Sequence, residues 1–403
     1  MSNPLRDKHI ILGITGSIAA YKGADLASKL TQSGALVDVL LTAAALKFVT
    51  PLTFQSVTGR KAFTDAELWG GEAHVIHVGI GHSADLLVVA PASANTIAKL
   101  ANGIGDNLLC VTALATQCPL VLAPAMDGDM YAHPATQANV EVLRQRGAVI
   151  VGPAAGHLAS GLVGVGRMTE PLEILGHIRF LLGKTGRLQG KKVVISAGGT
   201  QEAIDPVRMI TNRSSGRQGY ALAQSALDEG AEVVLVTTPT HLPAPVGARL
   251  VPVLTAQEML SAVLAESADA DVLIMAAAVA DFRPVQAATQ KLKKQAGIPF
   301  LELEPTQDIL AAVAAQRITS NHPLCVVGFA AESQNLLQNA QTKLQTKGLD
   351  LIAANDISAT DAGFEVSTNR VTLLFADGRV DALPMLLKDE VAERILDEVI
   401  ACL

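Results

Sequence analysis

Two glycine-rich segments could bind a phosphate group, because each follows a short apolar run and precedes a helix-like stretch. The first, Thr15–Ile18, follows the run His9–Ile14, and the second, Ala197–Thr200, follows Lys192–Ser196. A turn of this kind presents backbone N–H groups at the start of a helix, where they favour an anionic group. Neither turn has the G-x-G-x-x-G spacing of a dinucleotide site, so a tight turn without a ligand remains the alternative for each.

Polar residues at strand ends form a second set of candidates in the first half of the chain. Thr42, Ser93, Asn95 and Asp127 each lie at, or shortly after, the end of an expected strand. Ligands of open parallel sheets bind at the carboxyl ends of strands, so these residues could share one site. His77 lies between two expected strands. A lone histidine is more often a core or surface residue than a proton donor, so its spacing alone does not assign it.

The second half contains a cationic segment just before an expected helix. Arg208, Arg213 and Arg217 lie close together with Asn212, a pattern that could hold a polyanion. A solvated charged loop is the alternative interpretation.

Further along the chain, Asp281 precedes a lysine cluster that begins at Lys291. An acidic residue close to lysines fits a nucleoside triphosphate that carries a metal ion, although a charged surface loop gives the same pattern. Lys343 and Lys347 lie four residues apart and would share one helix face, as phosphate ligands or as surface charges.

The order of the expected elements indicates the fold. In the first half we expect strands at 9–14, 37–42, 86–90, 120–123 and 148–151, and helices at 19–33, 94–101, 106–116, 135–146 and 171–182. In the second half we expect strands at 192–196, 232–237, 272–277, 324–329, 350–354 and 371–375, and helices at 216–229, 256–267, 306–317, 333–347 and 387–401. Alternation of this kind predicts an α/β protein with two doubly wound, mainly parallel-sheet domains.

The polar, glycine-rich segment 183–190 separates the two halves and predicts a linker. We therefore expect domains at 1–182 and 191–403. The segment contains Gly-Lys-Thr, but Ile178 stands where a P-loop needs its first glycine, so a P-loop is excluded.

Composition excludes several classes of protein. The chain has 403 residues, of which 49% are hydrophobic and 17% charged, which is typical of globular domains rather than disordered or fibrous chains. A net charge of −7 and 3% aromatic residues argue against a nucleic-acid partner. The longest apolar run, Val272–Ala280, has nine residues, whereas a membrane-spanning helix needs roughly 20. The four cysteines show no C-x-x-C spacing and no signal peptide is evident, so we expect a reduced, cytoplasmic protein without structural zinc.

Ordered motifs along the whole chain resemble one family. The first half carries Thr15–Lys22, the segment around His77, Ala90–Asn95 and Pro124–Tyr131. The second half carries Asp205–Gly216, Ala276–Asp281, the lysine cluster from Lys291, and Val327–Glu332. With these motifs the chain resembles the bifunctional phosphopantothenoylcysteine decarboxylase/phosphopantothenate–cysteine ligases of coenzyme A biosynthesis. The resemblance implies a flavoprotein-type Rossmann-like domain followed by a Rossmann-like ligase domain.

For the first half, the resemblance implies an FMN-dependent decarboxylase. The cysteinyl thiol of phosphopantothenoylcysteine is oxidised, CO₂ is lost, and a hydride and a proton complete 4′-phosphopantetheine. His77 would be the acid or base beside the substrate carboxylate. The implied cofactor-binding residues are Gly16, Ser17, Thr42, Ser93, Asn95 and Met126.

For the second half, the resemblance implies a ligase that uses CTP with Mg²⁺, although no metal ligand can be assigned. The carboxylate of 4′-phosphopantothenate attacks CTP, and the resulting acyl-cytidylate reacts with the amine of L-cysteine. Asn212 would bind the activated acyl group, supported by Arg208, and Lys291 would stabilise charge at the α-phosphate. The residues implied around the nucleotide are Asp281, Gln307, Asp308, Ile309, Leu310, Phe329, Lys343 and Lys347.

The chain departs from the family pattern at two positions. Asp127 stands where the family commonly has asparagine, and Ser160 stands where well-known members have the cysteine that donates the final proton. Serine is a far weaker acid than cysteine. The decarboxylase half could use another donor, such as His77, Asp127 or a water held by Ser160. Alternatively, it could stall at the enethiol, or bind flavin without completing the reaction.

Two other functional classes share parts of this pattern. An NAD(P)-linked oxidoreductase has the same architecture, but its glycine fingerprint is missing here. A non-catalytic flavoprotein that acts as a binding module would lack turnover with CTP. The resemblance further implies a homo-oligomer, in which decarboxylase domains form trimers and ligase domains form dimers, together a dodecamer. The remaining expected partners are small-molecule substrates.

Overall fold

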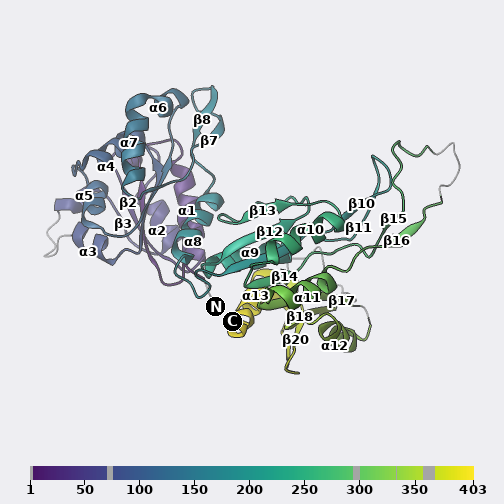
Figure 1. The fold of residues 1–403 in the computed structure, drawn as a ribbon. Coiled ribbons are helices and arrows are strands. Elements are labelled where there is room, and N and C mark those ends of the chain that lie inside the picture. Colours follow the sequence, from purple (N-terminus) through teal and green to yellow (C-terminus); the bar gives the residue numbers. More distant parts are fainter. Residues whose placement is uncertain (1–2, 70–75, 294–299, 333, 357–367) are drawn as a thin grey trace. The chain divides into compact units, whose positions relative to one another are not determined.

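The computed structural model describes residues 3–69, 76–293, 300–332, 334–356 and 368–403. These residues form two compact units, 3–182 and 183–403, each built on its own sheet (Figure 1). In the described part of the chain we find no helix that is both long enough and apolar enough to cross a membrane.

The N-terminal unit contains a parallel sheet of the order β3-β2-β1-β4-β5-β6. Its strands are β1 (His9–Ile14), β2 (Leu36–Leu41), β3 (Ala62–Phe63), β4 (Leu86–Ala92), β5 (Leu120–Pro124) and β6 (Val149–Ile150). Its helices are α1 (Ala20–Gln32), α2 (Pro51–Thr58), α3 (Ile76–Ser83), α4 (Ala94–Asn102), α5 (Leu108–Ala115), α6 (Gly128–Ala132), α7 (Pro134–Gln145) and α8 (Pro171–Gly183). A separate hairpin consists of β7 (Ala154–His157) and β8 (Val163–Arg167).

Two hydrophobic cores, one on each face, explain why the strands of this unit are almost continuously apolar. Ile10, Leu12 and Ile14 of β1 pack with residues of α1, α2 and α8, whereas Ile11 packs with residues of α4, α5 and α7. Successive side chains of a strand point to opposite faces, so a strand covered on both sides buries every residue. The arrangement confirms the predicted doubly wound α/β class.

The C-terminal unit contains a sheet of the order β13-β12-β9-β14-β17-β18-β20-β21. Its strands are β9 (Lys192–Ala197), β12 (Glu232–Thr237), β13 (Arg249–Pro252), β14 (Val272–Met275), β17 (Cys325–Glu332), β18 (Leu351–Asp356), β20 (Val371–Phe375) and β21 (Val380–Ala382). The pairs from β13 to β18 are parallel, and β20 and β21 complete the sheet in antiparallel pairing. The sheet is therefore mainly parallel, as predicted, with an antiparallel edge that the expected strand at 371–375 did not reveal.

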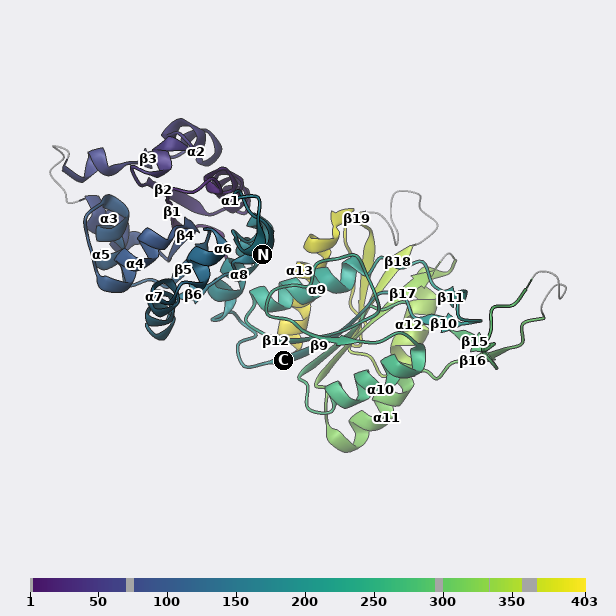
Figure 2. The same ribbon diagram turned by 90° about the horizontal axis from the view of Figure 1, so that it is seen from above.

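Helices cover both faces of this second sheet (Figure 2). They are α9 (Arg217–Asp228), α10 (Ala256–Ser267), α11 (Ile309–Ser320), α12 (Leu336–Thr346) and α13 (Lys388–Cys402). Helices α10, α11 and α12 share one core with the sheet, and α13 packs on α9. Three small two-stranded antiparallel sheets pair β10 (Gln201–Ala203) with β11 (Met209–Thr211), β15 (Phe282–Pro284) with β16 (Leu303–Pro305), and β19 (Thr368–Asn369) with β22 (Leu386–Leu387).

The segment predicted as a linker packs on the C-terminal unit. Leu188 is buried, and its amide donates a hydrogen bond of 2.7 Å to the carbonyl of Glu229. The guanidinium of Arg187 pairs with Glu229 and, at 2.7 Å, with Asp397. These contacts make residues 184–190 part of this unit rather than a free tether.

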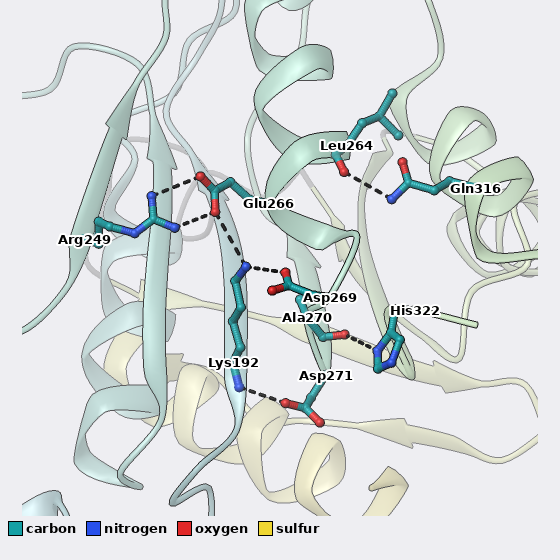
Figure 3. A network of polar contacts seen from close by, with 9 residues as sticks. All are labelled: Lys192, Arg249, Leu264, Glu266, Asp269, Ala270, Asp271, Gln316 and His322. Atoms are coloured by element: carbon teal, nitrogen blue, oxygen red, sulfur yellow. Dashed lines mark hydrogen bonds and ion pairs between the residues drawn. The ribbon is translucent and has the colours of Figure 1, made fainter. Parts of the chain in front are cut away.

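A polar network fixes the amino ends of the strands, at the edge opposite to the carboxyl ends (Figure 3). The amide of Lys192 donates to Asp271 at 2.9 Å, and its ammonium pairs with Asp269 at 2.5 Å. The guanidinium of Arg249 donates to both oxygens of Glu266. Because these charges are paired with one another, we assign this edge a structural role and place ligand chemistry at the other edge.

Candidate active sites

Hydrogen bonds bring two of the N-terminal strand ends together. The buried hydroxyl of Thr15 donates to the carbonyl of Pro91 at 2.7 Å and accepts from the amide of Ser93 at 2.9 Å. Ser93 is the N-cap of α4, and Asn95 lies exposed in the first turn of that helix. The glycine-rich turn and the start of α4 therefore lie at the same edge, as parallel pairing of β1 and β4 requires.

The end of β2 reaches the same edge. The amide of Thr42 donates to the carbonyl of Ile14 at 3.1 Å. A Cβ atom on Gly16 would lie 2.5 Å from the Cβ atom of Ala44, so glycine permits the close approach of the two turns. The predicted flavin residues Gly16, Thr42 and Ser93 thus meet, although they come from three separate motifs.

A cavity of about 440 Å³ opens beside this edge. Four predicted residues line it, namely Ser17, Met126, Asp127 and Ser160. Its wall also includes the hairpin residues His157–Ser160 and Gly166–Met168. Gly16, Thr42, Ser93 and Asn95 lie at the strand edge without forming part of this lining.

Ser160 and Asp127 form a direct link across the cavity wall. The hydroxyl of Ser160 donates to Oδ2 of Asp127 at 2.6 Å, and the amide of Asp129 donates to Oδ1 at 3.1 Å. The hydrogen bond from Ser160, and then that from Asp129, lower the pKa of Asp127. Asp127 is therefore a carboxylate near neutral pH and can only accept hydrogen bonds.

Two cations beside the cavity were not predicted. Lys22 and Arg167 line the cavity and pair with the same carboxylate, Glu170, at 2.7 and 2.9 Å. The hydrogen bond from Lys22 is the largest effect on Glu170 and lowers its pKa. Lys22 is the last residue of the motif Thr15–Lys22, so the sequence marked it as part of a motif. Nothing in the sequence linked it to residues 167–170.

His77 lies on α3 outside the lining of this cavity. Its Nδ1 atom is buried and has no hydrogen-bond partner among the described residues. A buried ring nitrogen without a partner is unfavourable unless a ligand or a water satisfies it. The segment immediately before α3, residues 70–75, lies outside the described residues.

The C-terminal unit has a larger cavity, of about 590 Å³, at the carboxyl ends of its strands. It collects most residues predicted for the ligase site: Asn212, Asp281, Gln307, Asp308, Ile309, Leu310, Phe329, Lys343 and Lys347. These residues come from five separate segments of the chain. Parallel strands bring their following loops to one edge, which is why the set assembles.

Polar contacts position several of these side chains. The side-chain Nδ2 atom of Asn212 donates to the carbonyl of Val279 at 2.9 Å, and the ammonium of Lys343 donates to the carbonyl of Phe329 at 2.9 Å. Asp308 caps α11 by accepting from the amide of Ala311 at 2.9 Å, and Lys347 pairs with it. Although burial raises the pKa of Asp308, the hydrogen bonds and charge of Lys347 outweigh burial and lower it overall.

Arg208 and Lys291 lie outside the lining of this cavity. The guanidinium of Arg208 holds Asp205 through Nε at 2.9 Å and donates to the carbonyl of Leu292 at 2.8 Å. This arginine holds the pKa of Asp205 well below its usual range. Arg208 thus connects the β10–β11 hairpin to the segment of Lys291, whose own side chain is exposed.

Sequence reasoning missed three residues that line this cavity, namely Gln218, Asn355 and Lys388, whereas Arg217 was among the candidates for holding a polyanion. Lys388 is 7% exposed and comes from the first residue of the last helix. No local pattern marks it, because its placement depends on the packing of α13 on α9. Across the described ranges, no three His, Cys, Asp or Glu side chains gather in a way that could hold a metal ion.

Comparison with known proteins gives matches over both halves. Residues 1–183 match the family described as flavoprotein, and residues 188–403 match the DNA/pantothenate metabolism flavoprotein C-terminal domain. The coenzyme A biosynthesis bifunctional protein CoaBC of Bacillus subtilis is 44% identical over 400 residues, which cover 98% of each chain. The protein of the same name from Vibrio cholerae is 46% identical, covering 97% of this chain and 98% of its own. A solved C-terminal domain of such a protein is 41% identical and covers 54% of this chain and 97% of that chain, with a TM-score of 0.46.

Proposed function

The chain belongs to the family of coenzyme A biosynthesis bifunctional proteins, and we propose that its two units divide the two reactions between them. The chain is a bifunctional enzyme with phosphopantothenate–cysteine ligase and phosphopantothenoylcysteine decarboxylase activities. In this proposal residues 191–403 carry the ligase and residues 1–182 carry the decarboxylase. The comparisons give no support to a decarboxylase half that stalls at the enethiol or only binds flavin.

One observation carries the ligase assignment: nine predicted residues from five segments line a single cavity. In the proposed reaction the carboxylate of 4′-phosphopantothenate attacks the α-phosphorus of CTP, and pyrophosphate leaves. The amine of L-cysteine then attacks the acyl carbon of the acyl-cytidylate, and CMP leaves. Positioning and neutralisation of charge provide most of the catalysis in such a transfer.

Residues of the cavity can perform these tasks. Lys343 and Lys347 supply positive charge on one flank, and Phe329 offers an apolar surface beside them. Asn212 is oriented by its bond to Val279, which leaves its amide oxygen for the acyl group. Lys291 would approach the α-phosphate from the exposed segment held by Arg208. A Mg²⁺ ion would be held mainly by phosphate oxygens, with Asp281 as the candidate carboxylate.

The N-terminal residues fit FMN. Backbone amides of Thr15–Ser17 and the start of α4 meet at the strand edge, and the partnerless buried Nδ1 of His77 is available to a bound group. Gly16, Ser17, Thr42, Ser93, Asn95 and Met126 are the proposed binding residues. When bound, FMN supplies the oxidation of the thiol and the return of a hydride.

We propose His77 as the donor of the final proton, and the contacts of Ser160 and Asp127 support this choice. The single O–H of Ser160 is donated to Asp127, and ionised Asp127 has no proton to give. An imidazole is a common general acid in enzymes, and the Nδ1 atom of His77 has no hydrogen-bond partner among the described residues. Ser160 and Asp127 then act together to hold the hairpin over the substrate.

Assays of the complete chain test the proposal. Pyrophosphate release from CTP should require both 4′-phosphopantothenate and L-cysteine. Asn212→Ala should abolish ligation while decarboxylation of added phosphopantothenoylcysteine continues. Loss of both activities in this folded variant would contradict the division between units.

We further propose that the subunits associate, with decarboxylase units as trimers and ligase units as dimers. Exposed apolar residues such as Phe282, 55% exposed, and Leu303, 45% exposed, support an interface at the β15–β16 hairpin. Light scattering of the full chain measures the mass of the assembly, and a monomer would contradict this part of the proposal.

A further inference from the structure

Lys388 is a buried cation in the ligase cavity that neither the sequence pattern nor the proposed reaction uses. It is 7% exposed and lines the cavity at the start of α13. The side-chain Nε2 atom of Gln218, in α9, donates a hydrogen bond of 3.1 Å to the backbone carbonyl of Lys388. This bond fixes the first turn of α13 against the first turn of α9, so the position of Lys388 is built into the packing of the two helices.

A second cation lies beside it. Arg217, the first residue of α9, lines the same cavity. Burial, and then the positive charge of Arg217, lower the pKa of Lys388 to about 8. A phosphate group bound beside these two side chains would be attracted to both charges.

The start of α9 adds backbone donors to the same place. Gly216 is its N-cap, with a φ of 75° and no side chain to cap the helix, and residues 216–219 all line the cavity. The first N–H groups of a helix have no acceptor within the helix, and the helix dipole adds partial positive charge there. A phosphate group is the ligand that such an end favours.

An independent observation also indicates a ligand. Asn355, at the end of β18, is 7% exposed and lines the cavity, and its Oδ1 atom has no hydrogen-bond partner among the described residues. Gln218 also lines the cavity, and its buried Oε1 atom likewise has no hydrogen-bond partner among the described residues. An unpartnered amide oxygen accepts a hydrogen bond, so these two atoms indicate a ligand that brings a donor, such as a hydroxyl or amino group, into the cavity.

We propose that Lys388 is a substrate-binding residue of the ligase half, which together with Arg217 and the first turn of α9 holds a phosphate group. The inference rests on the proposed ligase function and adds a residue and a ligand chemistry to it. Two substrates carry the required group: CTP at its terminal phosphates, and 4′-phosphopantothenate at its phosphate monoester. At the terminal phosphates, Lys388 would also stabilise the negative charge that pyrophosphate gains when the bond between the α-phosphorus and the bridging oxygen breaks.

The test uses the complete chain and the variant Lys388→Met. We measure pyrophosphate release and determine KM separately for CTP, 4′-phosphopantothenate and cysteine. The KM of one phosphate-bearing substrate should rise by about tenfold or more, as expected from the loss of a charge-assisted contact, and the KM of cysteine should not change. Lys388→Arg should restore most of the loss. Arg394→Met serves as the control, because Arg394 lies on the same helix, is exposed, and pairs with Asp381.

The pattern of effects identifies the source of the phosphate. A higher KM for CTP, together with weaker inhibition by added pyrophosphate, assigns the phosphate to the terminal phosphates of CTP. A higher KM for 4′-phosphopantothenate assigns it to the phosphate monoester. A higher KM for cysteine alone, or no change in the KM of any substrate, overturns the proposal. If the wild-type chain releases no pyrophosphate from CTP, the proposed function itself fails.

A second measurement needs no substitution. Acetylation of Lys388 by an amine-reactive reagent, followed by mass spectrometry of its peptide, reports access to the ammonium in the wild-type chain. Saturating CTP or 4′-phosphopantothenate should slow the labelling of Lys388 severalfold. Labelling that neither substrate slows overturns the proposal, even if Lys388→Met does not fold.

Discussion

The hydroxyl of Ser160 donates a hydrogen bond of 2.6 Å to Oδ2 of Asp127, which ties the tip of the β7–β8 hairpin to the N-cap of α6. The pair suits a hydrogen bond, since a carboxylate accepts the bond that a serine hydroxyl donates. The contact holds two parts of the cavity wall together.

Ser160→Ala tests this link. Removal of the hydroxyl should raise the KM for phosphopantothenoylcysteine by roughly three- to tenfold, because one charge-assisted hydrogen bond no longer holds the hairpin. Steady-state decarboxylation measures the effect. Ser160→Thr retains a hydroxyl and should stay close to the wild type, and an unchanged KM in Ser160→Ala would show that the link does not position the substrate.

His77→Gln tests the assigned proton donor. Formation of 4′-phosphopantetheine should fall by on the order of a hundredfold or more, the usual contribution of a general acid. Ligation should remain, because His77 belongs to the N-terminal unit. His82→Gln is a matched control on the same helix, since His82 is exposed. Full product formation by His77→Gln would assign the proton to another group.

Lys291→Gln tests a residue that lies outside the cavity lining. If its segment closes on the α-phosphate during turnover, pyrophosphate release should fall by on the order of a hundredfold, since a cation at a developing charge is lost. Arg283→Gln, in the neighbouring strand β15, removes a cation that pairs with Glu304 and should retain activity. Equal activity of Lys291→Gln and the wild type would remove Lys291 from the reaction.

The network at the opposite sheet edge predicts a pH dependence of stability. The hydrogen bond from Arg249 holds the pKa of Glu266 below its ordinary value. A carboxyl group with a lowered pKa in the folded state stabilises it above the unfolded pKa, and this contribution is lost as the pH falls. Glu266→Gln should therefore lower the free energy of unfolding by about 1 kcal/mol at pH 7 and by less near pH 3.

Urea denaturation of the full chain at the two pH values measures this difference. Glu302→Gln, which removes an exposed carboxylate, should change stability little at either pH. A difference between wild type and Glu266→Gln that grows as the pH falls would contradict the sign of the argument.

Sequence reasoning succeeded where local pattern and topology suffice. Apolar runs followed by polar turns predicted the parallel strands, and parallel pairing places the ends of such strands at one edge. For this reason the sequence could assign Thr42 and Ser93 to a site at the strand edge. Family resemblance added residues such as Phe329 and Lys347, which the pattern alone left as core or surface residues.

Tertiary structure decided the contacts between segments that are distant in the sequence. Lys388 reaches the cavity because α13 packs on α9, and its bond with Gln218 spans 170 positions. Ser160 meets Asp127 across 33 positions. The pairing of two such side chains depends on how helices and hairpins pack, and this packing minimises a free energy summed over the whole unit. A run of neighbouring residues carries the periodicity of one strand or helix, but it does not contain the positions of the partners that decide whether a buried charge is tolerated.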